Sequence, residues 1–542
     1  MEKKWWHNSV VYQIYPRSFK DSNGDGIGDL RGIINKLDHV KELGADVIWL
    51  SPVYKSPMKD NGYDISDYQA IEPIFGTMDD MDELIKEADQ RGIKIVMDLV
   101  VNHTSDQHHW FKESRKSKDN PYRDYYIWRD EEDTNDIASV FSGPTWKWDE
   151  QAGQYYFHLF ADEQPDLNWE NPKVQEEVHN MINWWLEKGI GGFRLDVIDL
   201  IGKEVDKKIT GNGPRLHPLI KQMNKETFGN YDVLTVGETW GATPEIAMMY
   251  SDPEREEFSM IFQFEHMVID WDKDHGKWKP HTFDFVKLKE ILSKWQVDLK
   301  GKGWNSLFWN NHDLPRIVSR WGNDKEYRYE SATALATILH GMQGTPYVFQ
   351  GEEIGMTNVK YVSLEEYNDV EIHGAYQEKV VENNVLTEEE FMDGVYQNGR
   401  DNARTPIQWN NTEHGGFTTG TPWLKVNQNY TEVNVEADKL SEQSVFNYHK
   451  NLISIRKSDA YSDLIVYGEY EAIDLAHQSL FAYKRMNDDK EILVVVNFSE
   501  QELNYSFEGT IKKILATNYN KKYTNLKELT LSPYESFIVE LD

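Results

Sequence analysis

The sequence predicts an α/β fold: a (β/α)8 TIM barrel with a loop-rich inserted domain after its third strand and a C-terminal antiparallel β domain. Three observations support this prediction. Short apolar runs alternate with amphipathic helical patterns eight times in succession. One connection is far too long for a simple strand-to-helix loop. Near the end of the chain the pattern changes to short alternating strands. A doubly wound open sheet is the weaker alternative.

Eight runs are expected to form the barrel strands. They are short, and several are apolar on both faces, as strands of a covered parallel sheet should be. They span residues 11–15, 46–50, 94–100, 192–197, 233–237, 258–264, 306–309 and 346–349.

Amphipathic helices fit between these strands. Segment 30–43 places its aliphatic residues on one helical face, and Gly44 is expected to end it. Asn171 and Pro172 form an N-cap and first-turn pair for a second helix, which is expected to end near Gly189.

The long connection and the change of pattern define the expected domains. The barrel comprises residues 1–103 and 171–460. Residues 104–170 are rich in Trp, Tyr, Asp and Gly and form an inserted domain over the barrel mouth. Residues 461–542, with strands at 491–497 and 536–541, form the C-terminal β domain.

The composition restricts the partners of the protein. With 58 basic and 92 acidic residues the formal charge is −34, which would repel nucleic acid and anionic membranes but not a neutral sugar. The 19 Trp, 29 Tyr and 22 Phe supply flat apolar faces that suit sugar rings. There is no membrane-length apolar run, no signal-peptide pattern at the N-terminus and no cysteine. We therefore expect a cytoplasmic monomer with a small-molecule ligand and no nucleic-acid or membrane partner.

Acidic residues stand at the ends of the predicted strands. Asp98, Asp196 and Glu238 end the third, fourth and fifth strands, and Asp313 follows the seventh. A single acid is usually solvated, but four at equivalent strand ends inside apolar runs would be costly to bury without a purpose. A barrel enzyme works at this end of its strands, so we expect the four to converge on one cleft.

This pattern suits glycoside cleavage, which needs one ionised and one protonated carboxyl group. Arg194 lies on the same strand face as Asp196 and is expected to lower its pKa, keeping it ready to attack the anomeric carbon. Glu238 would protonate the leaving oxygen and then deprotonate water. Asp313 could bind sugar hydroxyls more tightly as the ring distorts. The separation of the carboxyls, which decides between retention and inversion, stays open at this point.

Four motifs in this order resemble those of the α-amylase superfamily, family 13 of the glycoside hydrolases. The likeness covers the whole chain and is strongest to the branch of oligo-1,6-glucosidases and dextran glucosidases (glucan 1,6-α-glucosidases). The motifs are DLVVNH at 98–103, GFRLDVI at 192–198, VGETW at 236–240 and NNHD at 310–313.

The resemblance implies a retaining mechanism through a covalent glucosyl-enzyme. It implies that Asp196 is the nucleophile, Glu238 the acid/base and Asp313 the transition-state stabiliser. A pocket that binds every hydroxyl of one terminal glucose would favour exo-action. The residues that the resemblance assigns to this pocket are Tyr63, Asp64, His103, Arg194, His312 and Arg400.

The prediction of which linkage is cleaved depends on fewer residues than the prediction of the mechanism. Members that act on α-1,6 bonds tend to have Val directly after the nucleophile, as Val197 stands here. Such a residue can discriminate by about 1–3 kcal/mol, although it could also be only a β-former at a strand end. Lys277 and Glu371 are the candidates for contacts with the next sugar. The expected substrates are isomalto-oligosaccharides or dextran fragments, cut at the non-reducing end.

A glycine-rich acidic loop resembles the first part of a calcium-binding EF-hand loop. The glutamate expected at its twelfth position is replaced by Gly32, so an acidic turn without metal is the alternative. Similar loops bind calcium in this branch, and the resemblance implies a structural Ca²⁺. The ligands would be Asp21, Asn23, Asp25, the backbone carbonyl of Ile27, and Asp29.

Four alternatives differ in function. Transporter heavy chains of this family are membrane-anchored scaffolds, but they lack the full set of carboxylates. Trehalose-6-phosphate hydrolases would need a cationic patch for the phosphate, and no basic cluster lies near the motifs. Sucrose isomerases have an Arg-rich loop where residues 317–321 read IVSRW. Enzymes specific for α-1,4 bonds are disfavoured by Val197. We place α-1,6 hydrolysis first and trehalose-6-phosphate hydrolysis second.

Overall fold

A closed parallel sheet forms the centre of the protein, in a computed structural model that describes residues 2–542. The strand order is β11-β10-β9-β5-β2-β1-β13-β12, and a parallel bridge between Ile261 and Asn305 joins the two edges. All eight predicted barrel strands are confirmed. Their bounds are β1 (Val11–Ile14), β2 (Val47–Leu50), β5 (Lys94–Leu99), β9 (Gly192–Leu195), β10 (Leu234–Glu238), β11 (Met260–Phe262), β12 (Ser306–Leu307) and β13 (Thr345–Phe349).

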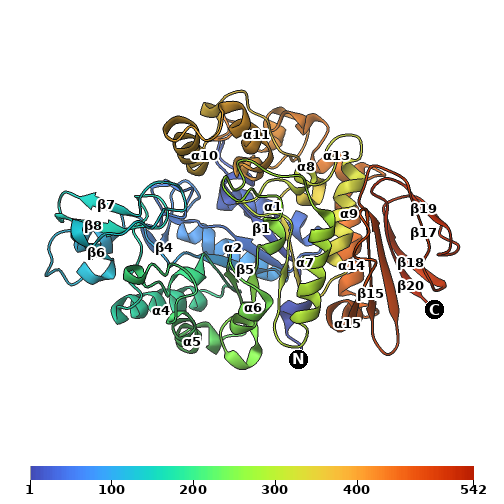
Figure 1. Cartoon of the computed structure of the whole chain (residues 1–542), viewed down its shortest axis with the longest axis horizontal. Coiled ribbons are helices and arrows are strands. Elements are labelled where there is room, and N and C mark those ends of the chain that lie inside the picture. Colours follow the sequence, from blue (N-terminus) through green and yellow to red (C-terminus); the bar gives the residue numbers. More distant parts are fainter. Residues whose placement is uncertain (1) are drawn as a thin grey trace.

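A helix follows each strand and covers the outside of the barrel (Figure 1). The side chain of Asp29 caps the first of these helices, and Gly44 ends it with φ +100°. Asn171 caps the predicted second helix by accepting a hydrogen bond from the amide of Lys173. The eight helices are α1 (Leu30–Leu43), α2 (Met78–Gln90), α4 (Pro172–Glu187), α5 (Leu216–Glu226), α6 (Pro244–Ser251), α7 (Phe285–Asp298), α9 (Arg328–His340) and α14 (Val445–Lys457).

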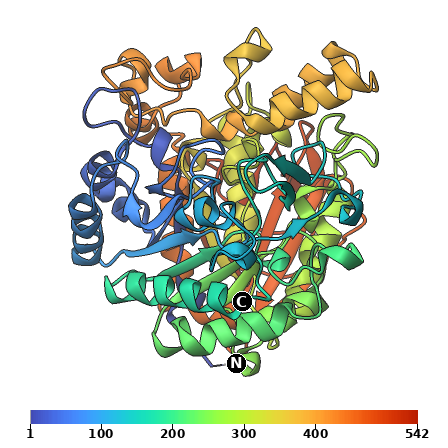
Figure 2. The same ribbon diagram turned by 90° about the vertical axis from the view of Figure 1, so that its left-hand side faces the viewer.

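The long connection after β5 contains a small antiparallel sheet of three strands in the order β6-β8-β7. Its elements are α3 (His109–Ser114), β6 (Trp128–Arg129), β7 (Trp146–Asp149) and β8 (Gln154–Phe157). This sheet lies at the opposite end of the molecule from the C-terminal strands (Figure 1), and it covers the near side of the barrel in the turned view (Figure 2). Two further strands, β3 (Tyr54–Lys55) and β4 (Asp67–Ile71), form a hairpin after β2.

A second long excursion follows β13, where the sequence analysis expected only barrel. It has its own apolar cluster, which includes Ile372, Phe391 and Val395. Its helices are α10 (Val370–Tyr376), a π-helical turn (Gln377–Glu382), α11 (Glu388–Asn398) and α12 (Asp401–Arg404). Helices α10 and α11 lie along the top of the molecule in Figures 1 and 2. The excursion therefore adds a second wall above the barrel mouth.

The C-terminal sheet is antiparallel in the order β14-β15-β16-β20-β18. Its strands are β14 (Glu469–Ile473), β15 (Leu480–Met486), β16 (Glu491–Asn497), β18 (Ile511–Thr517) and β20 (Ser536–Leu541), so both strands predicted here are confirmed. It packs on the barrel through α9, where the hydroxyl of Tyr483 donates to the carbonyl of Ile338 at 2.7 Å. Among residues 2–542, no helix is both long and apolar enough to span a bilayer.

Candidate active site

Alternation along the barrel strands brings the predicted acids to one point. Asp98 on β5 pairs with Arg194 on β9, and Arg194 pairs with Val236 on β10, so these three side chains share one layer inside the barrel. Two residues further on, Asp196 and Glu238 occupy the same inward face at the strand ends. The acids therefore converge, as the sequence predicted.

Arg194 is the centre of this cluster and is 1% exposed. Its Nη1 donates to Asp98 Oδ1 at 2.9 Å and to Asp196 Oδ1 at 2.7 Å, while its Nη2 donates to Glu238 Oε2 at 2.5 Å. One guanidinium thus holds three buried carboxyl groups. Because Asp196 and Glu238 are bound by the two terminal nitrogens of one planar group, they lie close together.

The charge of Arg194 does not suffice to lower the pKa of Asp196, so the sequence expectation is wrong in this respect. Burial raises the pKa of Asp196 well above its usual range; Glu238 and Asp98 raise it further, and Arg194 opposes them. Burial likewise raises the pKa of Asp98 to about 6 against the opposing charge of Arg194. Three carboxyls share one cation, so the single charge of Arg194 does not offset the effect of burial on the pKa values of Asp98 and Asp196.

Asp313 lies in the opposite electrostatic setting. Arg400 Nη1 is 3.2 Å and Arg404 Nη2 3.0 Å from its Oδ1, and His312 Nε2 is 3.1 Å from its Oδ2. Burial would raise the pKa of Asp313, but its contact with His312 and the charges of Arg400, Arg404 and Arg194 outweigh it and hold the pKa well below its usual range. Asp313 is therefore ionised at every working pH.

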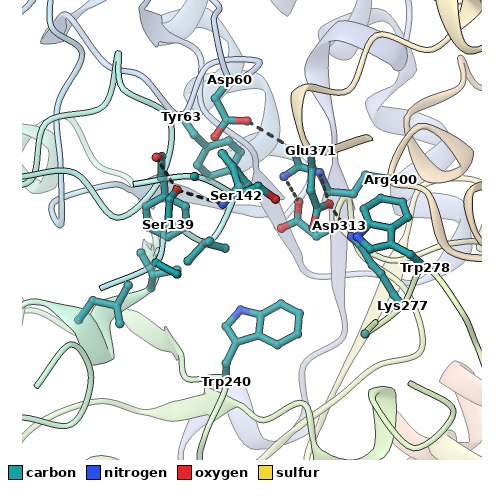
Figure 3. Close-up of a pocket in the computed structure, with 18 of the residues that line it drawn as sticks. Asp60, Tyr63, Ser139, Ser142, Trp240, Lys277, Trp278, Asp313, Glu371 and Arg400 are labelled. Carbon is teal, nitrogen blue, oxygen red and sulfur yellow. Dashed lines mark hydrogen bonds and ion pairs between the residues drawn. The ribbon is translucent and has the colours of Figure 1, made fainter. Parts of the chain in front are cut away.

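A cavity of about 600 Å³ opens above these acids, between the barrel mouth, the inserted segment and the excursion after β13. In Figure 3, Asp60, Tyr63, Asp313 and Arg400 lie together on one side of it, and Trp240 faces them across the open space. Seven further predicted residues line it: Asp196, Glu238, His103, His312, Val197, Lys277 and Glu371. Arg194 lies beneath it.

Aromatic and imidazole rings form part of the cavity wall. Tyr63 stacks on His312 with ring centroids 5.1 Å apart, and its hydroxyl donates to Asp98 Oδ2 at 2.9 Å. Burial lowers the pKa of His103 to about 4 and that of His312 to about 3, so both imidazoles are neutral at pH 7. Neutral rings can donate and accept hydrogen bonds with sugar hydroxyls.

The prediction for Asp64 is wrong, and Asp60 occupies the place expected for it. Asp64 is absent from the cavity lining, since its carboxylate accepts from the backbone amides of Lys59 and Asp60 and from the hydroxyl of Ser56. Asp64 therefore stabilises the turn of residues 59–64 through these hydrogen bonds. Asp60 lines the cavity, with its carboxylate 3.6 Å from Arg400, and burial raises its pKa to about 7.

The two candidates for contact with the next sugar lie together. Lys277 Nζ is 2.5 Å from Glu371 Oε2, and the same oxygen is 3.2 Å from Arg400 Nε. Figure 3 shows this group beside Trp278. Arg400 is fixed from behind by Asp369, at 2.5 Å from Nη2. Sequence reasoning did not single out Asp369, which comes from the unexpected excursion and precedes α10.

Val197 combines an unusual backbone with a contact to Glu238. Its φ of +37° is in the left-handed region, where a β-branched residue is strained by about 1–3 kcal/mol. In this conformation its amide donates to Glu238 Oε2 at 3.0 Å, and its side chain lines the cavity. Trp240 binds the other carboxylate oxygen of Glu238, since its Nε1 donates to Oε1 at 2.9 Å. Trp240 belongs to a quoted motif, but no pattern indicated that contact.

The predicted metal loop is preordered by its own hydrogen bonds. Asp21 Oδ1 accepts from the amides of Asn23 and Gly24, Asn23 Oδ1 from the amide of Asp25, and Asp25 Oδ1 from that of Ile27, each at 2.9 Å. Asp29 accepts from Ser22 and caps α1. The donors are hard oxygens, as Ca²⁺ prefers. Within residues 2–542 no group of three His, Cys, Asp or Glu side chains is clustered as for a metal, so a bound ion would also need the Asn23 amide and the Ile27 carbonyl.

A parallel eight-stranded barrel with paired carboxyls at its C-terminal end, under a cavity walled by rings and ionised groups, defines a glycoside-hydrolase type of site. The family model described as "Alpha amylase, catalytic domain" matches residues 13–468, and "Alpha-amylase SusG C-terminal domain" matches residues 480–538. The chain belongs to the α-amylase family of glycoside hydrolases.

Several relatives match over their full length. A glucan 1,6-α-glucosidase of Streptococcus pneumoniae serotype 4 is 54% identical, and an oligo-1,6-glucosidase of Parageobacillus thermoglucosidasius is 52% identical, each over 100% of both chains. The solved trehalose-6-phosphate hydrolase of Bacillus licheniformis is 46% identical, with a TM-score of 0.93 over 99% of this chain and 100% of that one. The family and branch expected from the motifs are confirmed.

Proposed function

We propose that the protein is an exo-acting, retaining α-glucosidase that hydrolyses α-1,6 bonds at the non-reducing end of isomalto-oligosaccharides or dextran fragments. The observation that supports this most directly is the placement of Asp196 and Glu238 on one guanidinium at the base of the cavity. The names of the relatives at 54% and 52% identity agree with the α-1,6 linkage.

The chemistry follows from these positions. Asp196 attacks the anomeric carbon while Glu238 protonates the glycosidic oxygen, which releases the leaving sugar and leaves a glucosyl ester on Asp196. The growing positive charge of the sugar favours the ionised form of Asp196, which is the form that attacks. Glu238 then removes a proton from water, and the water cleaves the ester.

The groups opposite Trp240 bind the terminal glucose. Asp313 is ionised and fixed by Arg400 and Arg404, so it can accept hydrogen bonds that strengthen as the ring flattens. Arg400 and Asp60 contact each other on the same side of the cavity (Figure 3) and offer hydrogen-bonding groups to the end of a terminal glucose, which supports exo-action. Both carboxyls bind the same guanidinium, which agrees with the shorter separation of retaining enzymes; inverting enzymes keep their carboxyls about 6.5–9.5 Å apart to admit water.

The charges in the cavity favour a neutral acceptor sugar over a phosphate. Its cationic lining residues are Lys277, Lys379 and Arg400, and each has a carboxylate within 4 Å. The lining carboxyls outnumber them. A phosphate would need an unpaired cation. Trehalose-6-phosphate hydrolysis, the activity named for a relative at 46% identity, therefore remains the second candidate.

Proton NMR of the first turnovers of 4-nitrophenyl α-D-glucopyranoside tests the mechanism, because the only glucose released from this substrate comes from the cleaved bond. A retaining enzyme releases α-glucose first, and the β-anomer appears only later by mutarotation. Initial release of β-glucose would contradict the covalent intermediate on Asp196.

Two further properties belong to this proposal. The loop of Asp21 to Asp29 would hold a structural Ca²⁺ that fixes the start of α1, far in the chain from the chemistry. The protein would act as a monomer in the cytoplasm, which the absence of cysteine from a chain of 542 residues supports.

A further inference from the structure

One carboxyl group in the cavity has no role in the reaction described so far. Asp199 lies in the short turn Ile198–Leu200 that follows Val197, lines the cavity and is 6% exposed. Within residues 2–542, the only group that hydrogen-bonds its carboxyl is its own backbone amide. The other acids of the cavity base, Asp196, Glu238 and Asp313, each have an Arg partner.

An unpartnered buried carboxyl costs stability. Burial, with a smaller contribution from the nearby charge of Glu238, raises the pKa of Asp199 to about 7. A carboxyl whose folded pKa exceeds its unfolded value destabilises the fold at any pH above the unfolded value. Packing therefore does not explain why an acid stands here, whereas a ligand that completes its hydrogen bonding would.

The position of Asp199 indicates which part of a ligand it meets. Groups for the terminal glucose, including Asp60, Asp313 and Arg400, lie together on the side of the cavity opposite Trp240 (Figure 3). Asp199 instead lies close enough to Glu238 for the charge of Glu238 to raise its pKa. The general acid must point at the oxygen of the leaving group, so a polar residue beside it faces the sugar that departs.

We infer that Asp199 is a specificity-determining residue that hydrogen-bonds a hydroxyl of the leaving-group sugar, next to the scissile bond. This inference rests on the proposed glucosidase function and adds a contact to the acceptor side of the same cavity. The other two candidates for the acceptor side, Lys277 and Glu371, come from different elements, before α7 and on α10.

The test compares a sugar leaving group with one that has no sugar hydroxyls. We would measure kcat/KM for isomaltotriose and for 4-nitrophenyl α-D-glucopyranoside in the wild type, in Asp199→Asn and in Asp199→Ala. A hydrogen bond to a charged group predicts a loss of about ten- to a hundredfold on isomaltotriose in Asp199→Ala. Activity on the nitrophenyl glucoside should change less than about twofold. Asp199→Asn should recover part of the loss, because an amide still bonds a hydroxyl.

The control is Asp206→Asn, which removes an exposed carboxylate from the same β9–α5 connection, paired with Arg129. Both of its rates should match the wild type. Thermal unfolding at pH 8 should show that Asp199→Asn is no less stable than the wild type, since the buried acid destabilises the fold there.

Equal losses on the two substrates would overturn the inference, since they would place Asp199 in the chemical step. Unchanged rates on isomaltotriose, or a lowered unfolding temperature, would also overturn it. Failure of the proposed function would be visible in the wild type alone, as a preference for another disaccharide. The comparison would then use that disaccharide against the nitrophenyl glucoside.

Discussion

Replacement of Arg194 by Gln tests the electrostatic centre of the site. The substitution removes three hydrogen bonds, of 2.9, 2.7 and 2.5 Å, to Asp98, Asp196 and Glu238. Each such charge-assisted bond contributes about 1.5–3 kcal/mol, but the carboxyls can relax by taking up protons at about 1.4 kcal/mol per pKa unit. The free energy of unfolding at pH 7 should therefore fall by about 3–5 kcal/mol, the usual effect of leaving buried charges unpaired.

The pH dependence of the free energy of unfolding distinguishes the loss of charge pairing in Arg194→Gln from a packing defect. Without Arg194 the pKa values of Asp98 and Asp196 rise further above their unfolded values, so the variant is destabilised at pH 7 and regains stability as the pH falls toward 5. Urea unfolding at both pH values measures this. Arg31→Gln is the control, because Arg31 also contacts two carboxylates but is exposed, and its loss should have little effect. A deficit for Arg194→Gln that is equal at pH 5 and pH 7 would refute the reasoning.

Three further predictions concern the reaction and the metal loop. Asp313→Asn should lower kcat by about 10²–10³ without loss of the fold, measured with isomaltotriose and circular dichroism, because its hydrogen bonds strengthen in the transition state; a near-normal kcat would contradict this role. Val197→Ala should shift the ratio of isomaltose to maltose hydrolysis toward maltose by about 10- to 100-fold, and an unchanged ratio would mean that Val197 serves only the backbone. Chelation with EDTA should lower the unfolding temperature of the wild type, and added Ca²⁺ should restore it. Added Ca²⁺ should not restore it in Asp21→Asn. Identical responses of the two proteins would exclude this loop as the site.

The strands and the convergence of the acids at their ends could be predicted because local signals define them. The barrel strands are apolar runs bounded by turns, and the acids at their ends interrupt those runs. Once the strands are parallel and closed, period-two alternation places Asp196 and Glu238 side by side. The convergence of these two acids therefore follows from the same alternation that is visible in the sequence.

Residues on long connections were harder to predict. Asp60 and Asp64 are separated by only four positions, and which of them lines the cavity depends on how backbone amides in the turn use the carboxylate of Asp64. Asp369 comes from an excursion with its own apolar cluster, which the sequence analysis had assigned to the barrel. The pKa of Asp196 was predicted in the wrong direction because the sequence shows the adjacent Arg194 but not the two other acids that share it.

The central claim is an α-1,6-glucosidase with Asp196 as nucleophile, and initial glucose release tests it most directly. Isomaltotriose, maltotriose and trehalose-6-phosphate would be compared side by side, with Asp196→Asn as the blank. The account predicts fastest release from isomaltotriose and none from the variant. Faster release from trehalose-6-phosphate would contradict the substrate, and activity that survives in Asp196→Asn would contradict the nucleophile.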